Sequence, residues 1–325
     1  MKNVSILVPE SAVPEAVADP RYLFNTANQF LLAAGKEPFF KVELVATKKT
    51  VRLQDGFFSV HPDRLLDEVD KTDLVVIPAL FGDMKKAVEK NKETIPWLLD
   101  QYQKGAELAS LCVGAFLLAS TGLLNGRKCS THWAFYNEFR DTFPHVEVQD
   151  GSIITEENRI YTSGGATSYW NLLLHLLEKY VDRDTAILAA KYFAIDIDRE
   201  SQSAFAIFRG QKDHTDEAIK NAQDFIEANY AERITLDQLA KNAAVSRRSF
   251  ERRFKQATGN TVVEYIQRVK IEAAKRSFEA TRKNISEVMY DVGYTDSKAF
   301  RSVFKKITGL TPIEYRNKYN KGVLN

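Results

Sequence analysis

A cysteine stands where an apolar strand is predicted to turn into a helix. Cys112 follows residues 108–111, which are predicted to form a buried strand. It precedes residues 113–119, which are predicted to form a helix with small residues at its start. This is the strand-to-helix geometry of a nucleophile elbow, which presents a side chain on a sharp turn. A thiol at a helix N-terminus is expected to have a lowered pKa. A buried structural cysteine is an equally good interpretation, because free cysteines commonly lie in protein cores.

Catalysis by a thiol needs a base within hydrogen-bond reach of the sulfur and an acid that orients this base. Val113, directly after the cysteine, offers no proton acceptor, and His132 beside Trp133 is explained as well by a structural role. Cys129 and His132 form a single Cys-x-x-His pair with no second pair, which argues against a metal site. Residues 163–165 lack the lysine and the spacing of a phosphate-binding loop. We therefore expect no enzyme activity, no metal and no cofactor.

A second pattern that could do chemistry lies near the C-terminus, where F-x-x-x-F-K-x-x-T-G-x-T-x-x-E-Y occurs twice. One copy begins at Phe250 and the other at Phe300, fifty positions later. Phe at i and i+4 places both rings on one buried stripe of a helix, and the Gly after Thr supplies the left-handed residue that ends it. A solenoid or propeller would need at least three copies. Two similar units fit a repetitive partner, and double-stranded DNA is such a partner.

Each copy is preceded by a short predicted helix and a tight turn. Residues 235–240 form an amphipathic helix, and Ser246 is the predicted N-cap of the helix after the turn. In the second copy the short helix covers residues 285–289, the turn passes through Gly293, and Asp296 is the N-cap. A helix, a short turn and a second helix form a helix-turn-helix, whose second helix enters the major groove of DNA.

The exposed face of each second helix carries cations that suit DNA. Arginine makes bidentate bonds to guanine, and lysine and arginine neutralise phosphates. A solvated charged face is the better interpretation for one helix alone, but the duplication favours DNA. The predicted DNA-contacting residues are Arg247, Arg248, Arg252, Arg253, Ser297, Lys298, Arg301, Ser302 and Lys305.

Residues from about 216 to 320 resemble the DNA-binding module of the arabinose-regulator (AraC) family of transcription factors. The resemblance includes the linker helix, residues 262–278, and the closing segment, residues 309–316. Two residues depart from the family pattern, because Ala244 stands at a turn position that is often Gly and Met289 replaces a customary Ala. The resemblance implies a double helix-turn-helix that binds promoter DNA.

The charge distribution agrees with two units of different kinds. Residues 211–325 contain 22 Lys and Arg and 15 Asp and Glu, a net charge of +7. Residues 1–210 contain 23 and 28 of these, a net charge of −5. A basic unit joined to a mildly acidic one fits a DNA reader attached to a domain that avoids DNA.

The N-terminal part alternates apolar, β-branched runs with helical patterns. The alternation of strands and helices implies a parallel sheet covered on both faces, with ligands near the strand ends. The predicted strands are residues 4–8, 41–45, 74–77 and 108–111, and the predicted helices include residues 22–34 and 95–104.

The residues around the cysteine resemble the class I glutamine-amidotransferase-like superfamily, and more narrowly the PfpI/ThiJ-type sensory domains fused to AraC-type modules. The resemblance is carried by residues 110–119, 122–127, 131–133 and 162–165. It implies a flavodoxin-like α/β sandwich with a ligand pocket around the elbow. The residues expected to line this pocket are Glu10, Cys112, Val113, Gly114, His132, Gly164 and Gly165.

These patterns predict three segments, namely a sensory domain at residues 1–195, a linker at 196–215 and a double helix-turn-helix domain at 216–325. The predicted fold is α/β, a flavodoxin-like sandwich with a mostly parallel sheet, followed by an all-α domain. We expect a DNA-binding transcription regulator that senses a small metabolite. An amino acid or a quaternary amine is implied by the resemblance alone.

The expected partners are double-stranded DNA, the small effector and a second copy of the chain in a homodimer formed by the sensory domain, with RNA polymerase as a further candidate. Two alternatives are open: a thiol hydrolase or amidase with a DNA-binding tail, and a constitutive DNA-binding scaffold with an empty sensor. The weakly polar residues 110–124 are too few for a membrane span of about 20 residues. With no signal sequence and no secreted-type disulfide framework, we expect a cytoplasmic protein without membrane contact.

Overall fold

The computed structural model describes residues 1–197, 201–208, 210–212 and 214–320. The chain divides into two compact units, Met1–Gln202 and Ser203–Asn325. The predicted linker, residues 196–215, includes residues 198–200, 209 and 213, which lie outside the described residues. Among the described residues, no helix is long and apolar enough to cross a membrane.

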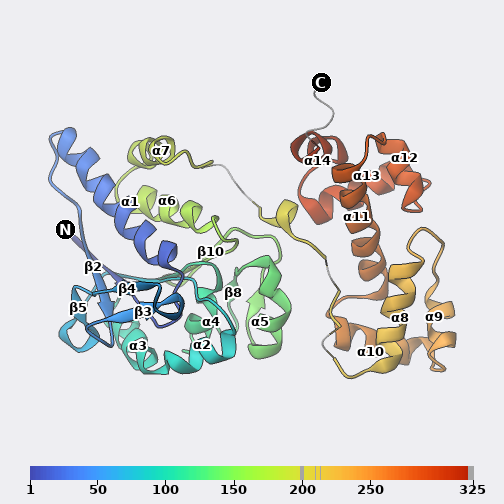
Figure 1. Ribbon diagram of the computed structural model, residues 1–325, viewed down its shortest axis with the longest axis horizontal. Coiled ribbons are helices and arrows are strands. Elements are labelled where there is room, and N and C mark those ends of the chain that lie inside the picture. The colour runs from blue at the N-terminus through green and yellow to red at the C-terminus, as the bar shows by residue number, and fades with distance from the viewer. Residues whose placement is uncertain (198–200, 209, 213, 321–325) are drawn as a thin grey trace. The chain divides into compact units, whose positions relative to one another are not determined.

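A mostly parallel sheet forms the centre of the N-terminal unit (Figure 1). The strands lie in the order β10-β11-β7-β6-β1-β2-β5; β10 is antiparallel to β11, and the other neighbours are parallel. The register sets Val4 opposite Val42 and Ile77 opposite Ser110. The strands are β1 (Lys2–Leu7), β2 (Phe40–Ala46), β5 (Arg64–Leu65), β6 (Leu74–Ile77), β7 (Glu107–Ser110), β10 (Ile154–Glu157) and β11 (Ile160–Ser163).

Helices cover both faces of this sheet. In Figure 1, α1 (Pro14–Ala33), α6 (Tyr169–Tyr180) and α7 (Arg183–Tyr192) lie on one face, and α2 (Met84–Lys90), α3 (Ile95–Gln103) and α4 (Ala115–Ala119) lie on the other. The apolar runs of β1 and β6 are buried between these layers, which confirms the predicted α/β sandwich. Smaller elements are β3 (Val51–Leu53), β4 (Phe58–Val60), β8 (Lys128–Cys129), α5 (Tyr136–Thr142) and β9 (Glu147–Val148).

The first helix differs from the prediction, because α1 begins at Pro14 and not at residue 22. Pro14 suits the start of a helix, since its missing N–H has no partner there in any case. Pro20 lies inside α1, where the lost hydrogen bond normally disfavours a helix. Ala16, Val17 and Pro20 are all buried, so tertiary packing overrides the local signal.

The C-terminal unit contains two helix-turn-helix halves. The paired phenylalanines of each repeat are fully buried, in two separate cores. The long helix α11 joins the halves, because its Tyr265 belongs to the first core and its Phe278 to the second. The helices are α8 (Glu217–Ala228), α9 (Leu236–Asn242), α10 (Arg247–Thr258), α11 (Val262–Ala280), α12 (Ile285–Asp291), α13 (Ser297–Thr308) and α14 (Pro312–Tyr319).

The predicted starts and ends of α10 and α13 are confirmed by their caps, whereas α9 and α12 each extend two residues beyond the predicted ends at residues 240 and 289. Ser246 accepts a hydrogen bond from the Ser249 backbone N–H, and Asp296 accepts hydrogen bonds from the start of α13. Gly259 and Gly309 end α10 and α13 in the left-handed conformation, with φ of 67° and 76°. The sequence pattern was sufficient here because each cap is a local interaction.

The turns between the paired helices are also equivalent in the two halves. Ala244 and Gly293 both have positive φ, at 53° and 74°. The second turn is fastened to α11, because Lys270 Nζ donates to the carbonyl oxygens of Val292 and Gly293 at 3.0 and 3.3 Å. Burial lowers the pKa of Lys270. The two turns therefore share a positive φ at the same position, and the second is also hydrogen-bonded to α11.

Candidate functional site

The second helix of each half presents most of its charged side chains to solvent. On α10, Arg248 and Arg252 are exposed, and on α13 so is Arg301; none of these three side chains has an ion-pair partner among the described residues. The other α13 residues predicted to contact DNA, namely Ser297, Lys298, Ser302 and Lys305, are exposed as well. These cations are available to an anionic partner while the phenylalanines behind them hold the helices in place.

The remaining α10 arginines differ from this pattern. Arg253 Nε and Nη2 lie 2.8 and 2.6 Å from the two carboxylate oxygens of Asp216, the N-cap of α8. These hydrogen bonds are the main cause of the lowered pKa of Asp216. Arg253 therefore ties α10 to α8, and its predicted DNA contact stays a prediction. Arg247 is exposed, and its guanidinium nitrogens lie 3.7 Å from an Asp237 carboxylate oxygen and 3.8 Å from one of Glu251. Exposed ion pairs of this kind contribute little to stability.

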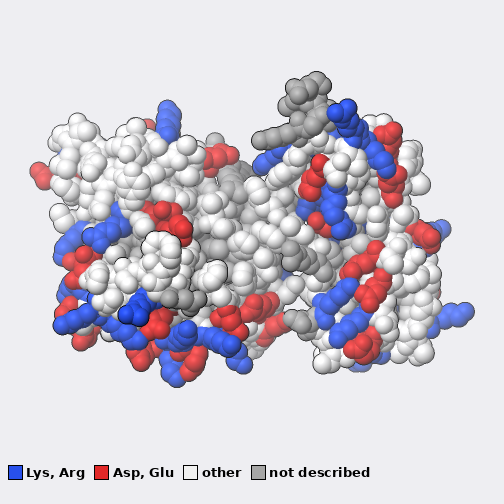
Figure 2. Space-filling model, in the orientation of Figure 1, with Lys and Arg blue, Asp and Glu red and all other residues white. Residues whose placement is uncertain are grey.

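The surface charges are mixed in the view of Figure 2. Lys and Arg side chains alternate with Asp and Glu side chains over both units on this face. The difference in net charge between the two parts of the sequence is therefore not gathered into one continuous patch on the visible side. The candidate nucleic-acid contacts rest on the individual exposed cations of α10 and α13.

The elbow at the end of β7 has the sharp geometry that the sequence predicts. Cys112 has a φ of 55°, and a short 3-10 helix, Cys112–Gly114, leads into α4. A side-chain Cβ at Gly114 would lie 2.5 Å from the Pro78 carbonyl oxygen, so only glycine fits there. Thr131 Oγ1 donates to the Cys112 carbonyl, and the Cys112 N–H donates to Ser163 Oγ, both at 3.2 Å.

The predicted lowering of the Cys112 pKa is wrong. Burial raises the pKa of this thiol to about 12, and the hydrogen bond from the Val113 backbone offsets the effect only in part. The error arises because the position of the thiol before a helix was visible in the sequence, whereas its enclosure depends on tertiary packing.

Among the described residues, His132 makes no hydrogen bond to the Cys112 thiol. Its Nδ1 accepts a hydrogen bond from the Ala134 backbone N–H at 3.1 Å, which caps a short 3-10 helix, Trp133–Phe135. Burial lowers the pKa of His132, so the ring is neutral near pH 7. Within the described part of the chain, no basic side chain is hydrogen-bonded to Cys112 Sγ.

Gly164 and Gly165 of the predicted pocket adjoin a residue that the sequence did not indicate. A Cβ at Gly164 would lie 1.8 Å from Gln202 Nε2, so the buried carboxamide of Gln202 occupies the space that glycine leaves. Gly165 has a φ of 65° and adjoins Ser168. No local pattern marks Gln202, because its partners lie 50 to 71 positions earlier in the chain.

Glu10 has contacts of its own. It forms an ion pair with Lys48, and its backbone N–H donates to Asn91 Oδ1 at 2.7 Å. The described contacts of Glu10 therefore do not join it to the elbow, where Cys112 contacts Ser163 and Thr131.

A cavity of about 660 Å³ lies between α1 and β4. Two carboxylates, Glu15 and Asp19, line it. Asp19 accepts a hydrogen bond from Tyr169 Oη at 2.7 Å, and burial raises its pKa despite this bond. None of the seven predicted pocket residues is among the described residues that line this cavity. Its walls are Pro14, Glu15, Val17, Ala18, Asp19, Arg21, Tyr22, Asn25, Leu44, Phe58, Ser59 and Val60.

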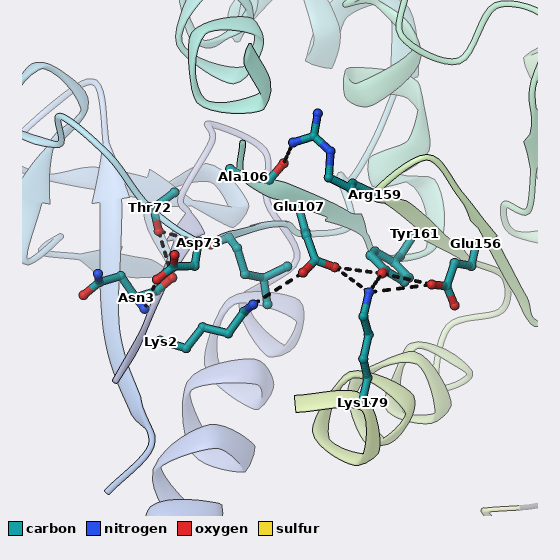
Figure 3. Close-up of polar contacts among 11 residues, drawn as sticks. Lys2, Asn3, Thr72, Asp73, Ala106, Glu107, Glu156, Arg159, Tyr161 and Lys179 are labelled. Atoms are coloured by element: carbon teal, nitrogen blue, oxygen red, sulfur yellow. Dashed lines mark hydrogen bonds and ion pairs between the residues drawn. The ribbon is translucent and has the colours of Figure 1, made fainter. Parts of the chain in front are cut away.

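A charged cluster lies at the opposite, amino end of the sheet (Figure 3). Tyr161 Oη lies 2.7 Å from Glu107 Oε2, and Lys179 Nζ lies 2.8 Å from the same oxygen. Burial disfavours ionisation of Glu107, but the hydrogen bonds from Lys179 and Tyr161 outweigh it and lower the pKa of the carboxyl. The positive charge of Lys179 compensates the negative charge of Glu107. Because Lys179 belongs to α6 and Glu107 to β7, this ion pair joins α6 to the sheet. Among the described residues, no group of three or more His, Cys, Asp or Glu could hold a metal ion.

Comparison with known proteins assigns each unit to a family. Residues 13–179 match the DJ-1/PfpI family, and residues 239–318 match a helix-turn-helix domain family. The HTH-type transcriptional regulator GbdR of Pseudomonas aeruginosa is 26% identical over 291 residues, which cover 89% of this chain and 77% of that protein. The HTH-type transcriptional regulator ArgR of the same organism is 27% identical over 221 residues, which cover 68% of this chain and 67% of that protein.

Solved structures share the fold of the N-terminal unit. A putative transcriptional regulator protein from Vibrio parahaemolyticus has a TM-score of 0.53 and 22% identity, and covers 59% of this chain and 98% of its own. An AraC family transcriptional regulator from Pseudomonas putida has a TM-score of 0.50 and 17% identity, and covers 59% of this chain and 100% of its own. The match to residues 13–179 covers half of the chain, and the C-terminal match coincides with the double helix-turn-helix. The chain therefore belongs to the DJ-1/PfpI family and, through its C-terminal unit, is a DNA-binding transcription regulator of the AraC type.

Proposed function

We propose that α10 and α13 enter successive major-groove segments on one side of promoter DNA, and that Arg248, Arg252 and Arg301 make contacts there. The observation that supports this proposal is the repeated arrangement of exposed cations, without an ion-pair partner among the described residues, over a buried pair of phenylalanines. A continuous helix, α11, joins the two halves and holds them at a fixed separation. Recognition helices that read one face of a duplex lie about 34 Å apart.

Binding to the protein's own promoter region, compared with random DNA of equal length, tests this function. We expect a clear preference for the promoter and an affinity that falls steeply with salt, because phosphate contacts release counterions. Arg252→Ala should weaken specific binding by about 1–3 kcal/mol if Arg252 reads a base. Arg52→Ala removes the same charge from an exposed position of the N-terminal unit and serves as the control. Equal affinity for promoter and random DNA would refute the proposal.

For the N-terminal unit, we propose that the cavity beside α1 binds a small organic cation, such as a quaternary amine or the amino group of an amino acid. Glu15 and Asp19 supply two carboxylates, and Arg21, the one cation among the described lining residues, pairs with Asp63 at 2.8 Å. The rings of Tyr22 and Phe58 also line the cavity. Aromatic faces beside carboxylates attract cations through the ring quadrupole and through charge.

Thermal unfolding with choline and with its neutral carbon isostere tests the class of effector. A ligand that binds only the folded protein raises its melting temperature, so choline should stabilise the protein and the isostere should not. Asp19→Asn should reduce the effect, whereas Asp141→Asn, at an exposed position of α5, should leave it unchanged. Equal stabilisation by the cation and the isostere would show that charge is not recognised.

We propose that Cys112 of the sensory domain does not form a covalent intermediate. GbdR and ArgR, two relatives of this chain, are transcription regulators, which agrees with a sensory role of this domain. A thiol with a pKa of about 12 and no hydrogen-bonded base within the described residues is a poor nucleophile at neutral pH.

We further propose that the protein is cytoplasmic and forms a homodimer through the sensory domain, with one DNA-binding unit on each half-site. Light scattering of the intact chain, compared with residues 203–325 alone, tests the assembly. A dimeric C-terminal fragment would contradict it.

A further inference from the structure

The side chain of Gln202 is inserted into a polar slot of the N-terminal unit. Its Nε2 lies 2.9 Å from the Thr131 carbonyl oxygen, 3.0 Å from the Ser152 carbonyl oxygen and 2.8 Å from Tyr136 Oη. Its Oε1 accepts a hydrogen bond from the Trp133 backbone N–H at 3.2 Å. The side chain is only 1% exposed. Gln202 is therefore held as a small-molecule ligand would be, by convergent polar groups.

The slot has the donor and acceptor pattern of a primary carboxamide. The two carbonyl oxygens can only accept hydrogen bonds, so they face the NH2 group, and the Trp133 N–H can only donate, so it faces the C=O group. A carboxylate of the same shape would place a negative charge against two carbonyl oxygens. Gly164 completes the slot, because any side chain there would overlap Gln202 Nε2.

Gln202 also lies at the junction of the two units. The backbone of Gln202 is held in the N-terminal unit as well, since its N–H donates to the Gly151 carbonyl oxygen at 2.9 Å. The next residues bond to the C-terminal unit. The Ala204 carbonyl oxygen accepts a hydrogen bond from Tyr319 Oη, and the Ala206 carbonyl oxygen accepts one from Nζ of the buried Lys275. Anchors in the sensory unit and in the DNA-binding unit are thus separated by a single residue, Ser203.

We propose that this slot is a carboxamide-binding site whose resident ligand is the chain's own Gln202, and that its occupancy controls DNA binding. While Gln202 is bound in the slot, the tether between the anchored residues of the two units consists of Ser203 alone. Release lengthens the tether and lowers the effective concentration of the second DNA-binding unit at its half-site. The last step rests on the proposed dimer; the carboxamide recognition does not.

Chemical rescue of Gln202→Ala tests recognition. The variant should unfold at a temperature lower by roughly 3–10 °C, because buried carbonyl groups lose their donor. Acetamide should restore part of this loss, and acetate at the same concentration and ionic strength should not. Equal effects of acetamide and acetate on the melting temperature would refute a carboxamide site.

Promoter affinity of the full chain tests control. Gln202→Ala should bind promoter DNA about fivefold more weakly or worse, at the lower end of known couplings between sites. Gly164→Ala should do the same, because its Cβ displaces the carboxamide, and it carries the test if Gln202→Ala does not fold. Gln101→Ala is the matched control, since Gln101 is a fully buried glutamine whose side chain accepts from Thr72 N–H and donates to the carbonyl oxygens of residues 69 and 70, none of which belongs to the slot. It should lower the melting temperature without changing promoter affinity.

The outcomes separate this proposal from the proposed function. If wild type prefers its promoter but Gln202→Ala and Gly164→Ala bind as tightly as wild type, the slot is structural and the proposal fails. If wild type shows no promoter preference, the proposed DNA reading fails, and the acetamide experiment still decides whether the slot recognises a carboxamide.

Discussion

The two helix-turn-helix turns should respond in opposite ways to the exchange of one methyl group. Ala244 holds a φ of 53°, where an L-residue other than glycine costs about 1–2 kcal/mol. Ala244→Gly removes this strain, but glycine loses more conformational freedom on folding, by about 0.5–1 kcal/mol. The net result should be a gain of about 0.5 kcal/mol in the free energy of unfolding of the C-terminal unit.

Gly293→Ala, the reciprocal change, should be strongly destabilising. Besides the positive φ, its Cβ would lie 2.1 Å from the Ala231 carbonyl oxygen and 2.7 Å from Lys270 Nζ. The lysine can move, but the backbone carbonyl cannot move without opening the contact between the two halves. Strain of about 1 kcal/mol and overpacking of about 1–3 kcal/mol give a loss of about 2–4 kcal/mol.

Urea unfolding followed by two signals measures both changes in the intact chain. All three tryptophans, Trp97, Trp133 and Trp170, belong to the N-terminal unit. Their fluorescence therefore reports that unit alone, whereas far-ultraviolet circular dichroism also reports the helices of the C-terminal unit. Both substitutions should move the dichroism transition and leave the fluorescence transition in place. The reasoning is refuted if Gly293→Ala is neutral or if Ala244→Gly destabilises the C-terminal unit.

Three further predictions concern charged and reactive side chains. Arg253→Ala should lower the stability of the C-terminal unit by about 1 kcal/mol, measured by urea unfolding, whereas Arg252→Ala should leave stability unchanged and weaken DNA binding; the opposite assignment would contradict the geometry. Because the pKa of Asp216 is lowered in the folded state, the contribution of its pair with Arg253 should be complete above about pH 4 and lost as pH falls through the folded value, and Arg253→Ala should flatten this acid dependence in unfolding experiments at pH 2–6. Alkylation of native Cys112 at pH 8 should be roughly a thousandfold slower than that of free cysteine, given its pKa of about 12, and should become fast in urea; rapid labelling of the native protein, read by mass spectrometry, would show that the thiol is accessible.

The sequence predicted those parts of the structure that depend on local signals. The phenylalanine pairs, the Thr-Gly helix ends and the Ser246 and Asp296 caps each lie within one turn of the feature that they determine, so α10 and α13 were predicted correctly. Four strands of the seven-stranded sheet, β1, β2, β6 and β7, were similarly visible as short apolar runs. The edge strands β5 and β10 and the inner strand β11 were not predicted.

Long-range features were not predictable in the same way. The Arg253–Asp216 pair joins residues 37 positions apart, and the contacts of Gln202 span 50 or more. The cavity beside α1 was missed because the helix begins before Pro20, where a proline argues against it. The Cys112 pKa depends on enclosure by several distant segments, so helix position alone gave the wrong sign.

The continuity of α11 has a consequence for how promoters of such a regulator can change. Each residue added to a helix rotates the remainder of that helix by about 100° and advances it by about 1.5 Å. One residue inserted between Val269 of the first core and Ile271 of the second would separate no two residues of the same core, but it would rotate one recognition helix out of phase with the other. If α10 and α13 enter DNA as proposed, the helical phase of α11 fixes the distance in base pairs between the two segments that they contact. A base change within one segment would alter one contact, whereas a change in the spacing would misalign a whole recognition helix.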